Sequence, residues 1–294
     1  DWLAHERRFS PHTLSGYQHD LAGFLGFLAG HLGGPPGLAE IEGLKPIDFR
    51  AWLADLNGRG LSRTSVARAA STSTVSSGLA RAYRSEFGLA PTVVTNATPY
   101  REAEPTPVGD PIRLVHSGAA LPNRALELMI DAVEAARDPV TLDLYLTGND
   151  PAYLETLARR CAQSRRCTLN DPVPYAALVE TLAGYDVGIF VLPPTTFNYR
   201  WALPNKLFDF VQARLGIIVG PSPEMSAIVD DRGLGVVCGD FTADALRRAI
   251  DGLDAHRVAA MKAAAHRAAP ALSAVLEVDK WATSLERIRQ DTKR

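Results

Sequence analysis

Apolar positions along the chain follow two different spacings. From residue 112 onward, short continuous apolar runs alternate with segments in which apolar side chains recur every three or four positions. A short apolar run between turn residues is typical of a strand buried on both faces, and the longer spacing is typical of an amphipathic helix. Strands that alternate with helices predict an α/β fold with a doubly wound, Rossmann-like parallel sheet. We therefore expect residues 112–294 to form such a domain, ending in a helix.

The same spacings predict the individual elements. Strands are expected over residues 112–116, 141–146, 186–192, 217–219 and 233–237, and helices over 123–136, 150–162, 175–183, 205–215 and 243–253. The tail from residue 258 to residue 289 is expected to be helical, with a break at Pro270.

The segment 186–219 is the clearest strand–helix–strand unit. Its helix carries apolar side chains on one face, and Gly216 is expected to end it. In parallel sheets of this kind, ligands bind outside the carboxyl ends of the strands. Polar side chains on the connecting loop and the first helical turns are therefore candidates for a binding site: Asn198, Arg200, Asn205, Lys206 and Asp209.

The first 70 residues carry no strand pattern. Ser10 and Pro11 are typical of a helix start, and apolar residues then recur at helical steps up to the Gly- and Pro-rich stretch 33–37. Two further helices are expected, one opening at Lys45–Pro46 and one capped by Ser62. Residues 1–70 thus predict a small all-α module, and the segment 71–111, with one strand and many Pro, Glu and Thr residues, predicts a junction and linker.

Composition limits the kind of protein. The net charge of −2 gives no general basic field for nucleic acid and no acidic excess typical of disorder. The three cysteines have no metal-binding spacing. Their small, odd number suits a reducing cytoplasm. The chain shows no signal-peptide pattern, and no apolar run approaches the ~20 residues of a membrane span. We expect a cytoplasmic protein without a metal or other cofactor, and no Ser-His-Asp, Cys-His or metal cluster is visible.

Two stretches of the α/β region resemble a known family. Residues 204–210 (PNKLFDF) and 220–225 (GPSPEM) resemble the donor-binding segment of the retaining family 4 glycosyltransferases, whose usual form is Pro-x-Lys-x-x-Glu-Tyr. Residues 74–96 resemble the segment that precedes the donor domain in that family. The resemblance implies one half of a GT-B fold, a UDP- or GDP-sugar donor, and retaining transfer of a hexosyl group to an unknown acceptor. Many members carry a second Glu eight residues before the acidic one, and Trp201 takes that place here.

The resemblance also assigns residues to the nucleotide-sugar. Asp209 takes the position of the acid that holds the ribose hydroxyls, and Arg124 that of a basic residue for the diphosphate. Gly118 would let the backbone approach the diphosphate, and Val173 with Pro174 would pack against the base. Asn205 and Lys206 complete the predicted set, since an anion bound near a helix start offsets the unfavourable placement of a lysine there.

Each of these assignments has a structural alternative. Gly118 also suits a simple tight turn, and Arg124 could be a solvated residue at a helix start. Asp209 could compensate the helix dipole, and Val173 with Pro174 could form an ordinary loop.

The N-terminal region resembles a different family. Residues 6–14 (ERRFSPHTL) and 60–69 (GLSRTSVARA) resemble the core-binding domain of Xer-type tyrosine recombinases, a module that clamps DNA. By that resemblance, four residues of the third helix would face phosphates: Arg63, Thr64, Ser65 and Arg68. We find no paired arginines, no His-x-x-Arg and no tyrosine nucleophile downstream, so recombination chemistry is not expected.

The two resemblances together predict a chimera. A helical module stands where the acceptor half of a glycosyltransferase normally lies, so the chain is expected to bind a nucleotide-sugar but to position an acceptor poorly. Two alternatives stay open: a DNA-binding module that lacks its catalytic domain, and a non-catalytic scaffold whose helical part serves packing or protein contacts.

Overall fold

The structure is a computed structural model that describes residues 23–31, 34, 73–87, 91–275, 277 and 280. Residues 23–31 are helical, as the apolar spacing predicts, with Leu28 buried. The remaining helices expected within residues 1–70 lie outside the described residues. The chain divides into two units, and the α/β unit comprises Ser73–Tyr83 and Ala90–Ser284.

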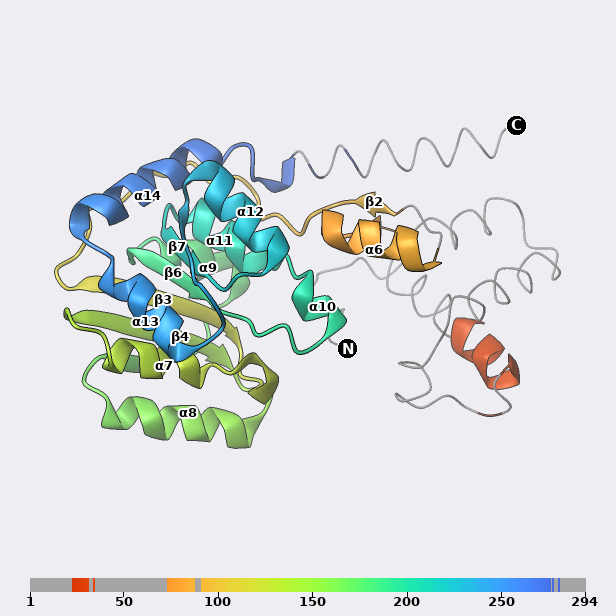
Figure 1. The fold of residues 1–294 in the computed structure, drawn as a ribbon, viewed down its shortest axis with the longest axis horizontal. Helices are drawn as coiled ribbons and strands as arrows, with labels where there is room; N and C mark the ends of the chain where they lie inside the picture. The colour runs from red at the N-terminus through yellow and green to blue at the C-terminus, as the bar shows by residue number, and fades with distance from the viewer. Residues whose placement is uncertain are drawn as a thin grey trace. The chain divides into compact units, whose positions relative to one another are not determined.

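The α/β unit is built on a six-stranded sheet in which every neighbouring pair is parallel (Figure 1). The predicted doubly wound fold is thus confirmed. Across the sheet the strand order is β5-β4-β3-β6-β7-β8. The strands are β3 (Ile112–Ala119), β4 (Val140–Thr147), β5 (Cys167–Asn170), β6 (Val187–Phe190), β7 (Gly216–Val219) and β8 (Gly235–Val237).

The order of the strands reverses between β3 and β6. Successive strands β3, β4 and β5 run outward on one side, and β6, β7 and β8 run outward on the other. Such a switch point opens a crevice at the carboxyl ends of the two central strands. The ladder between β3 and β6 joins only Leu114 to Val187 and Val115 to Gly188, whereas β3 pairs with β4 over its full length. The second half of β3 therefore extends past its ladder with β6.

Helices cover both faces of the sheet (Figure 1). The helices α7 (Glu127–Glu134), α8 (Pro151–Gln163) and α13 (Ala243–Asp251) lie on one face. The other face carries α9 (Tyr175–Leu182), α11 (Asn205–Gln212), α12 (Pro223–Arg232) and α14 (Ala255–Ala268). Short helices η1 (Pro122–Arg124) and α10 (Phe197–Arg200) lie in connecting segments.

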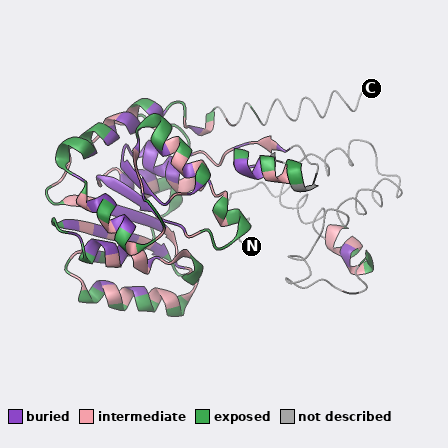
Figure 2. Ribbon diagram, viewed as in Figure 1, coloured by how far each residue is buried: buried purple, intermediate pink, exposed green. Residues whose placement is uncertain are grey.

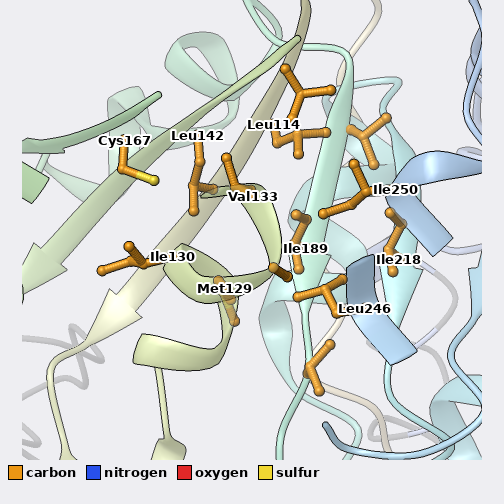
Figure 3. Close-up of a cluster of buried hydrophobic side chains, with 14 of the residues drawn as sticks. Leu114, Met129, Ile130, Val133, Leu142, Cys167, Ile189, Ile218, Leu246 and Ile250 are labelled. Atoms are coloured by element: carbon orange, nitrogen blue, oxygen red, sulfur yellow. The ribbon is translucent and has the colours of Figure 1, made fainter. Parts of the chain in front are cut away.

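Apolar side chains fill the space between these layers. On the first face, Leu114, Leu142 and Ile189 of the strands meet side chains of α7 and α13, including Val133 and Leu246 (Figure 3). The strands β6 and β7 are wholly buried and β3 is buried in its middle, whereas exposed positions gather on the helices (Figure 2). This distribution is what a sheet covered on both faces requires.

Three details differ from the sequence prediction. The edge strand β5 and the short helix α10 were not predicted. Helix α11 ends at Gln212, so Gly216 is not its terminator but the first residue of β7. Arg214 instead takes the left-handed turn, with φ 61°. Its guanidinium donates to the carbonyls of Val211, Gln212 and Arg101, and these bonds stabilise a conformation that otherwise favours glycine.

The segment before the sheet is partly ordered by a small strand–helix–strand unit. Strands β1 (Ser73–Thr74) and β2 (Thr92–Val93) pair in parallel and are joined by α6 (Ser77–Phe87). Residues 94–111 follow without regular structure, as expected for a linker.

An ion cluster fixes the end of this linker to the sheet. The carboxylate of Asp186, fully buried, accepts from the backbone N–H of Gly109 and from the guanidinium of Arg113. Lys262 of α14, also buried, donates to the Thr106 hydroxyl and lies 3.4 Å from the Asp186 carboxylate. The linker therefore begins β3 at a defined position.

Candidate functional site

Three of the predicted residues meet at the carboxyl end of β3. Gly118 has φ +156°, and a Cβ atom at this position would lie 2.5 Å from Cε and 2.9 Å from Nζ of Lys206. The same Cβ would lie 3.5 Å from a terminal guanidinium nitrogen of Arg124. Only glycine leaves this space to the two cationic side chains. Two positive groups that converge on one glycine form an arrangement suited to phosphate.

Local structure explains how each cation reaches this place. Lys206 is the second residue of α11, directly after Pro204 has started the helix, and its ammonium lies 5.6 Å from the centre of the Phe190 ring at the end of β6. Arg124 ends the short helix η1, and Ala125 after it adopts a left-handed conformation with φ 49°. A left-handed conformation usually favours glycine, so Ala125 holds an unusual backbone conformation directly after the arginine.

Asp209 is buried inside the protein. The residue is only 2% exposed, and its Oδ1 atom accepts from the Thr98 hydroxyl at 2.5 Å. The Tyr175 hydroxyl lies 3.5 Å from the same oxygen. Burial raises the pKa of Asp209 to about 6, although Thr98 and Lys206 favour the ionised form. The carboxylate is therefore already engaged by the protein, and ribose binding by Asp209 stays a prediction.

The other predicted contacts lie in connecting segments. Val173 is half-buried and Pro174 exposed, in the loop that leads from β5 to α9. Asn205, the first residue of α11, is half-buried. Asn198 and Arg200 are exposed on α10, and the Arg200 guanidinium lies 5.6 Å from the centre of the Trp201 ring.

Trp201 and Glu224 contact the start of α6. The Trp201 carbonyl accepts from the Ser76 hydroxyl, and a Cβ on Gly78 would lie 2.1 Å from the indole ring. The Glu224 carboxylate accepts from the backbone N–H of Ser77. Glu224, in the first turn of α12 (Pro223–Arg232), thus satisfies a backbone N–H at the start of α6.

His116 is a polar residue of this region that the sequence pattern left without a function. It is fully buried on β3, and its Nδ1 atom lies 2.9 Å from the Ile189 carbonyl. Its ring is parallel to that of Phe190 within 1°, with centroids 5.8 Å apart. Burial and the charges of Lys206 and Arg124 lower the pKa of His116 to about 3, so the imidazole is neutral.

Among the residues that the structure describes, no group of three or more His, Cys, Asp or Glu side chains could hold a metal ion. Across those residues, no helix has the length and apolar character needed to cross a membrane. The three cysteines are buried free thiols.

The N-terminal region is similar to a DNA-recombination family. The family described as "Phage integrase, N-terminal SAM-like domain" matches residues 1–75. Tyrosine recombinase XerC of Mesorhizobium japonicum is 44% identical over 66 residues, which are 22% of this chain and 21% of that protein. Tyrosine recombinase XerC of Rhodospirillum centenum is 47% identical over 53 residues, or 18% of this chain and 16% of that one. The chain thus spans about a fifth of these curated relatives.

The α/β unit is similar to solved glycosyltransferases. The Anabaena protein Alr3699/HepE in complex with UDP and glucose has a TM-score of 0.63 at 14% identity, over 84% of this chain and 68% of that one. The pneumococcal O-GlcNAc transferase GtfA in complex with UDP and GlcNAc has a TM-score of 0.56 at 18% identity, over 72% of this chain and 43% of that one. The likeness confirms the predicted fold, one half of the GT-B architecture.

Proposed function

We propose that the α/β unit binds a nucleotide-sugar, with UDP or GDP as the nucleotide. The observation that carries this proposal is the convergence of Lys206 and Arg124 on the backbone of Gly118. In the bound state, these two cations hold the diphosphate. Asp209 and Asn205 lie toward the ribose, and Val173 with Pro174 packs against the base. The UDP-bound proteins of similar fold support the choice of ligand.

The same cations suit the chemistry of hexosyl transfer. When the bond between the sugar C1 atom and the diphosphate oxygen breaks, its electron pair leaves with the diphosphate. Lys206 and Arg124 stabilise the charge that develops there, as fixed positive groups do in other transfer reactions. We therefore expect binding without a metal ion, and adding a chelator is expected to leave the nucleotide affinity unchanged.

Transfer itself needs an acceptor held in line with the sugar. Correct positioning contributes several kcal/mol to such reactions, about 7–11 in well-oriented cases. The described fold supplies the donor half of that geometry. We propose that this chain binds its donor well and transfers the hexosyl group slowly, with retention, to an acceptor of unknown class.

A thermal-shift panel with UDP, GDP and their sugars tests the nucleotide site. A ligand at about 100 times its dissociation constant stabilises the folded state by about 2.7 kcal/mol. We expect stabilisation by one nucleotide family and its loss in Lys206→Ala. Lys280→Ala is the matched control, because the Lys280 side chain is about half exposed and its ion pair among the described residues is with Glu277. If no nucleotide stabilises the protein, or if both variants behave alike, the proposal is wrong.

The match of residues 1–75 favours a second function, which is binding of DNA. The four residues that would face phosphates, Arg63, Thr64, Ser65 and Arg68, lie outside the described residues. We propose that they contact the duplex backbone, so affinity should fall steeply as salt rises. We also propose that this module ends near residue 70, that residues 71–111 join it to the nucleotide domain 112–294, and that the protein is cytoplasmic. A non-catalytic scaffold is the outcome if neither ligand binds.

A further inference from the structure

Beyond their short ladder, the strands β3 and β6 are joined by a side chain. Ladder pairing between these strands ends at Val115 and Gly188. One residue further, His116 Nδ1 lies 2.9 Å from the Ile189 carbonyl. A carbonyl can only accept, so Nδ1–H donates and Nε2 carries the lone pair. His116 thus joins the two strands at the point where their backbones separate.

The same ring supports the cation of the site. His116 stacks on Phe190, and the Lys206 ammonium lies 5.6 Å from the centre of that Phe190 ring. An ammonium near an aromatic face is attracted by the ring quadrupole, so the position of Phe190 influences the position of the charge. A continuous set of contacts therefore runs from the Ile189 carbonyl through His116 and Phe190 to Lys206.

The ionisation state of His116 suits this role. The charged groups that act on the ring are Lys206 and Arg124, both positive. A protonated imidazole would place a third positive charge inside the fold and repel Lys206. His116 is fully buried, and its Nε2 atom has no protein partner among the described residues. Because the ring is neutral, the positive charge near Gly118 comes from Lys206 and Arg124.

We propose that His116 is a positioning residue of the anion site. It fixes the separation of β3 and β6 and, through Phe190, the place of the Lys206 ammonium, although it does not touch the phosphate. This inference rests on the proposed nucleotide function. The inference concerns only the part of the binding free energy that comes from the diphosphate. This part can be measured separately from the binding of the nucleoside.

Two variants remove different contacts of His116, one the stacked ring and the other the hydrogen bond to Ile189. His116→Asn places an amide N–H near the position of Nδ1 and removes the stacked ring. His116→Phe keeps a ring and removes the donor to Ile189. For each variant, the dissociation constants of UDP and uridine are measured by calorimetry on the full chain. The ratio of the uridine constant to the UDP constant isolates the diphosphate contribution.

We expect both variants to reduce this ratio about fivefold, the effect of losing roughly one weak contact to the cation. The dissociation constant of uridine should stay within about a factor of two, since no base or sugar contact involves His116. Phe190→Leu removes the ring between His116 and Lys206 without adding a polar group. It is expected to reduce the ratio as well, and it serves if a His116 variant does not fold.

Two results would overturn the inference. An unchanged ratio in the folded variants contradicts a positioning role. A parallel rise of both dissociation constants shows a general structural defect instead. The proposed function fails in a different way, namely if the unaltered protein binds neither UDP nor GDP at all.

Discussion

At the residue scale, the candidate site depends on how little space surrounds Gly118. Lys206 and Arg124 come from segments about 80 positions apart, and both reach the same backbone. The backbone conformation at Gly118 and the absence of a Cβ atom are what allow this approach. A tight turn alone does not explain why the Lys206 side chain packs against Gly118, whereas a phosphate site does.

Gly118→Ala is therefore expected to weaken UDP binding by about tenfold or more, because the new methyl group displaces Lys206 and the backbone is strained at this φ. Titration calorimetry with UDP measures the effect. Gly239→Ala is the control, since a Cβ at Gly239 meets nothing within 4 Å. Equal UDP affinities for the two variants would contradict the proposed geometry.

Asp209 gives a prediction for stability. Its pKa is raised from 3.8 to about 6 in the folded protein, so the folded state holds this proton more tightly than the unfolded state. The contribution of Asp209 to stability is then greatest below about pH 4, falls as the pH rises to about 6, and is level above it. Asp209→Asn keeps an acceptor for Thr98 and removes this cost, which is on the order of 3 kcal/mol at pH 7.

Urea denaturation at pH 4 and pH 7 measures this difference. The Asn variant is expected to be the more stable protein at pH 7 and to match the unaltered protein at pH 4. The prediction is wrong if Asp209→Asn is less stable than the unaltered protein at pH 7, or if the difference in unfolding free energy is the same at both pH values. Either result would mean that the ionised carboxylate does not destabilise the fold.

Sequence reasoning found the cations of the site but not the partners of Asp209. Gly118, Arg124 and Lys206 lie at the ends of predicted strands and helices, where the edge of a parallel sheet brings them together. Thr98 lies in an irregular segment 111 residues before Asp209, and such a segment has no periodic pattern that reveals its contacts. The burial of Asp209 was missed because α11 is buried all round, although its apolar spacing predicts a single buried face.

At the element scale, the sheet is fixed to its linker by the cluster of Asp186, Arg113 and Lys262. Asp186 directly precedes β6, Arg113 is the second residue of β3 and Lys262 lies on α14, so one carboxylate connects three elements. The side chains of Asp186 and Lys262 are 0% and 1% exposed. Removing one partner of such a group leaves a buried charge without compensation.

Asp186→Asn is expected to destabilise the α/β unit by about 3–5 kcal/mol, the usual cost of breaking a buried pair. Chemical denaturation followed by circular dichroism measures it. Asp244→Asn is the control, because Asp244 pairs with Arg247 and Arg248 on the exposed side of α13 and is expected to leave the midpoint unchanged. A midpoint for Asp186→Asn equal to that of the control would mean that the cluster contributes little.

Elements with strong apolar spacing were predicted well, and elements held by tertiary contacts were not. The central strands and the helices α7, α8 and α13 have clear periodicity and lie within a few residues of their predicted bounds. Strand β5 is short and lies at the edge of the sheet, with half of its positions half-buried, so its sequence resembles a loop. The end of α11 depends on the Arg214 guanidinium, which substitutes for a terminal glycine.

At the scale of the whole molecule, two regions of the chain are similar to different kinds of protein. Residues 1–75 match a DNA-recombination module, and the α/β unit has a glycosyltransferase fold. We expect the two proposed ligands to bind independently, because each site is assigned to residues of a different unit.

The double variant Arg63→Glu, Arg68→Glu tests this independence. It is expected to abolish DNA retention in a gel-shift series at low salt and to leave the UDP affinity within about a factor of two. Lys206→Ala should show the reverse pattern. Loss of both activities in either variant would show that the two regions act as one.

The most direct test of the central claim is a crystal structure of the full chain with UDP bound. The account predicts density for the diphosphate beside Gly118, with phosphate oxygens within hydrogen-bond distance of the Lys206 ammonium and the Arg124 guanidinium. Density for the nucleotide at another place, or none at a UDP concentration that saturates binding in solution, would contradict the account.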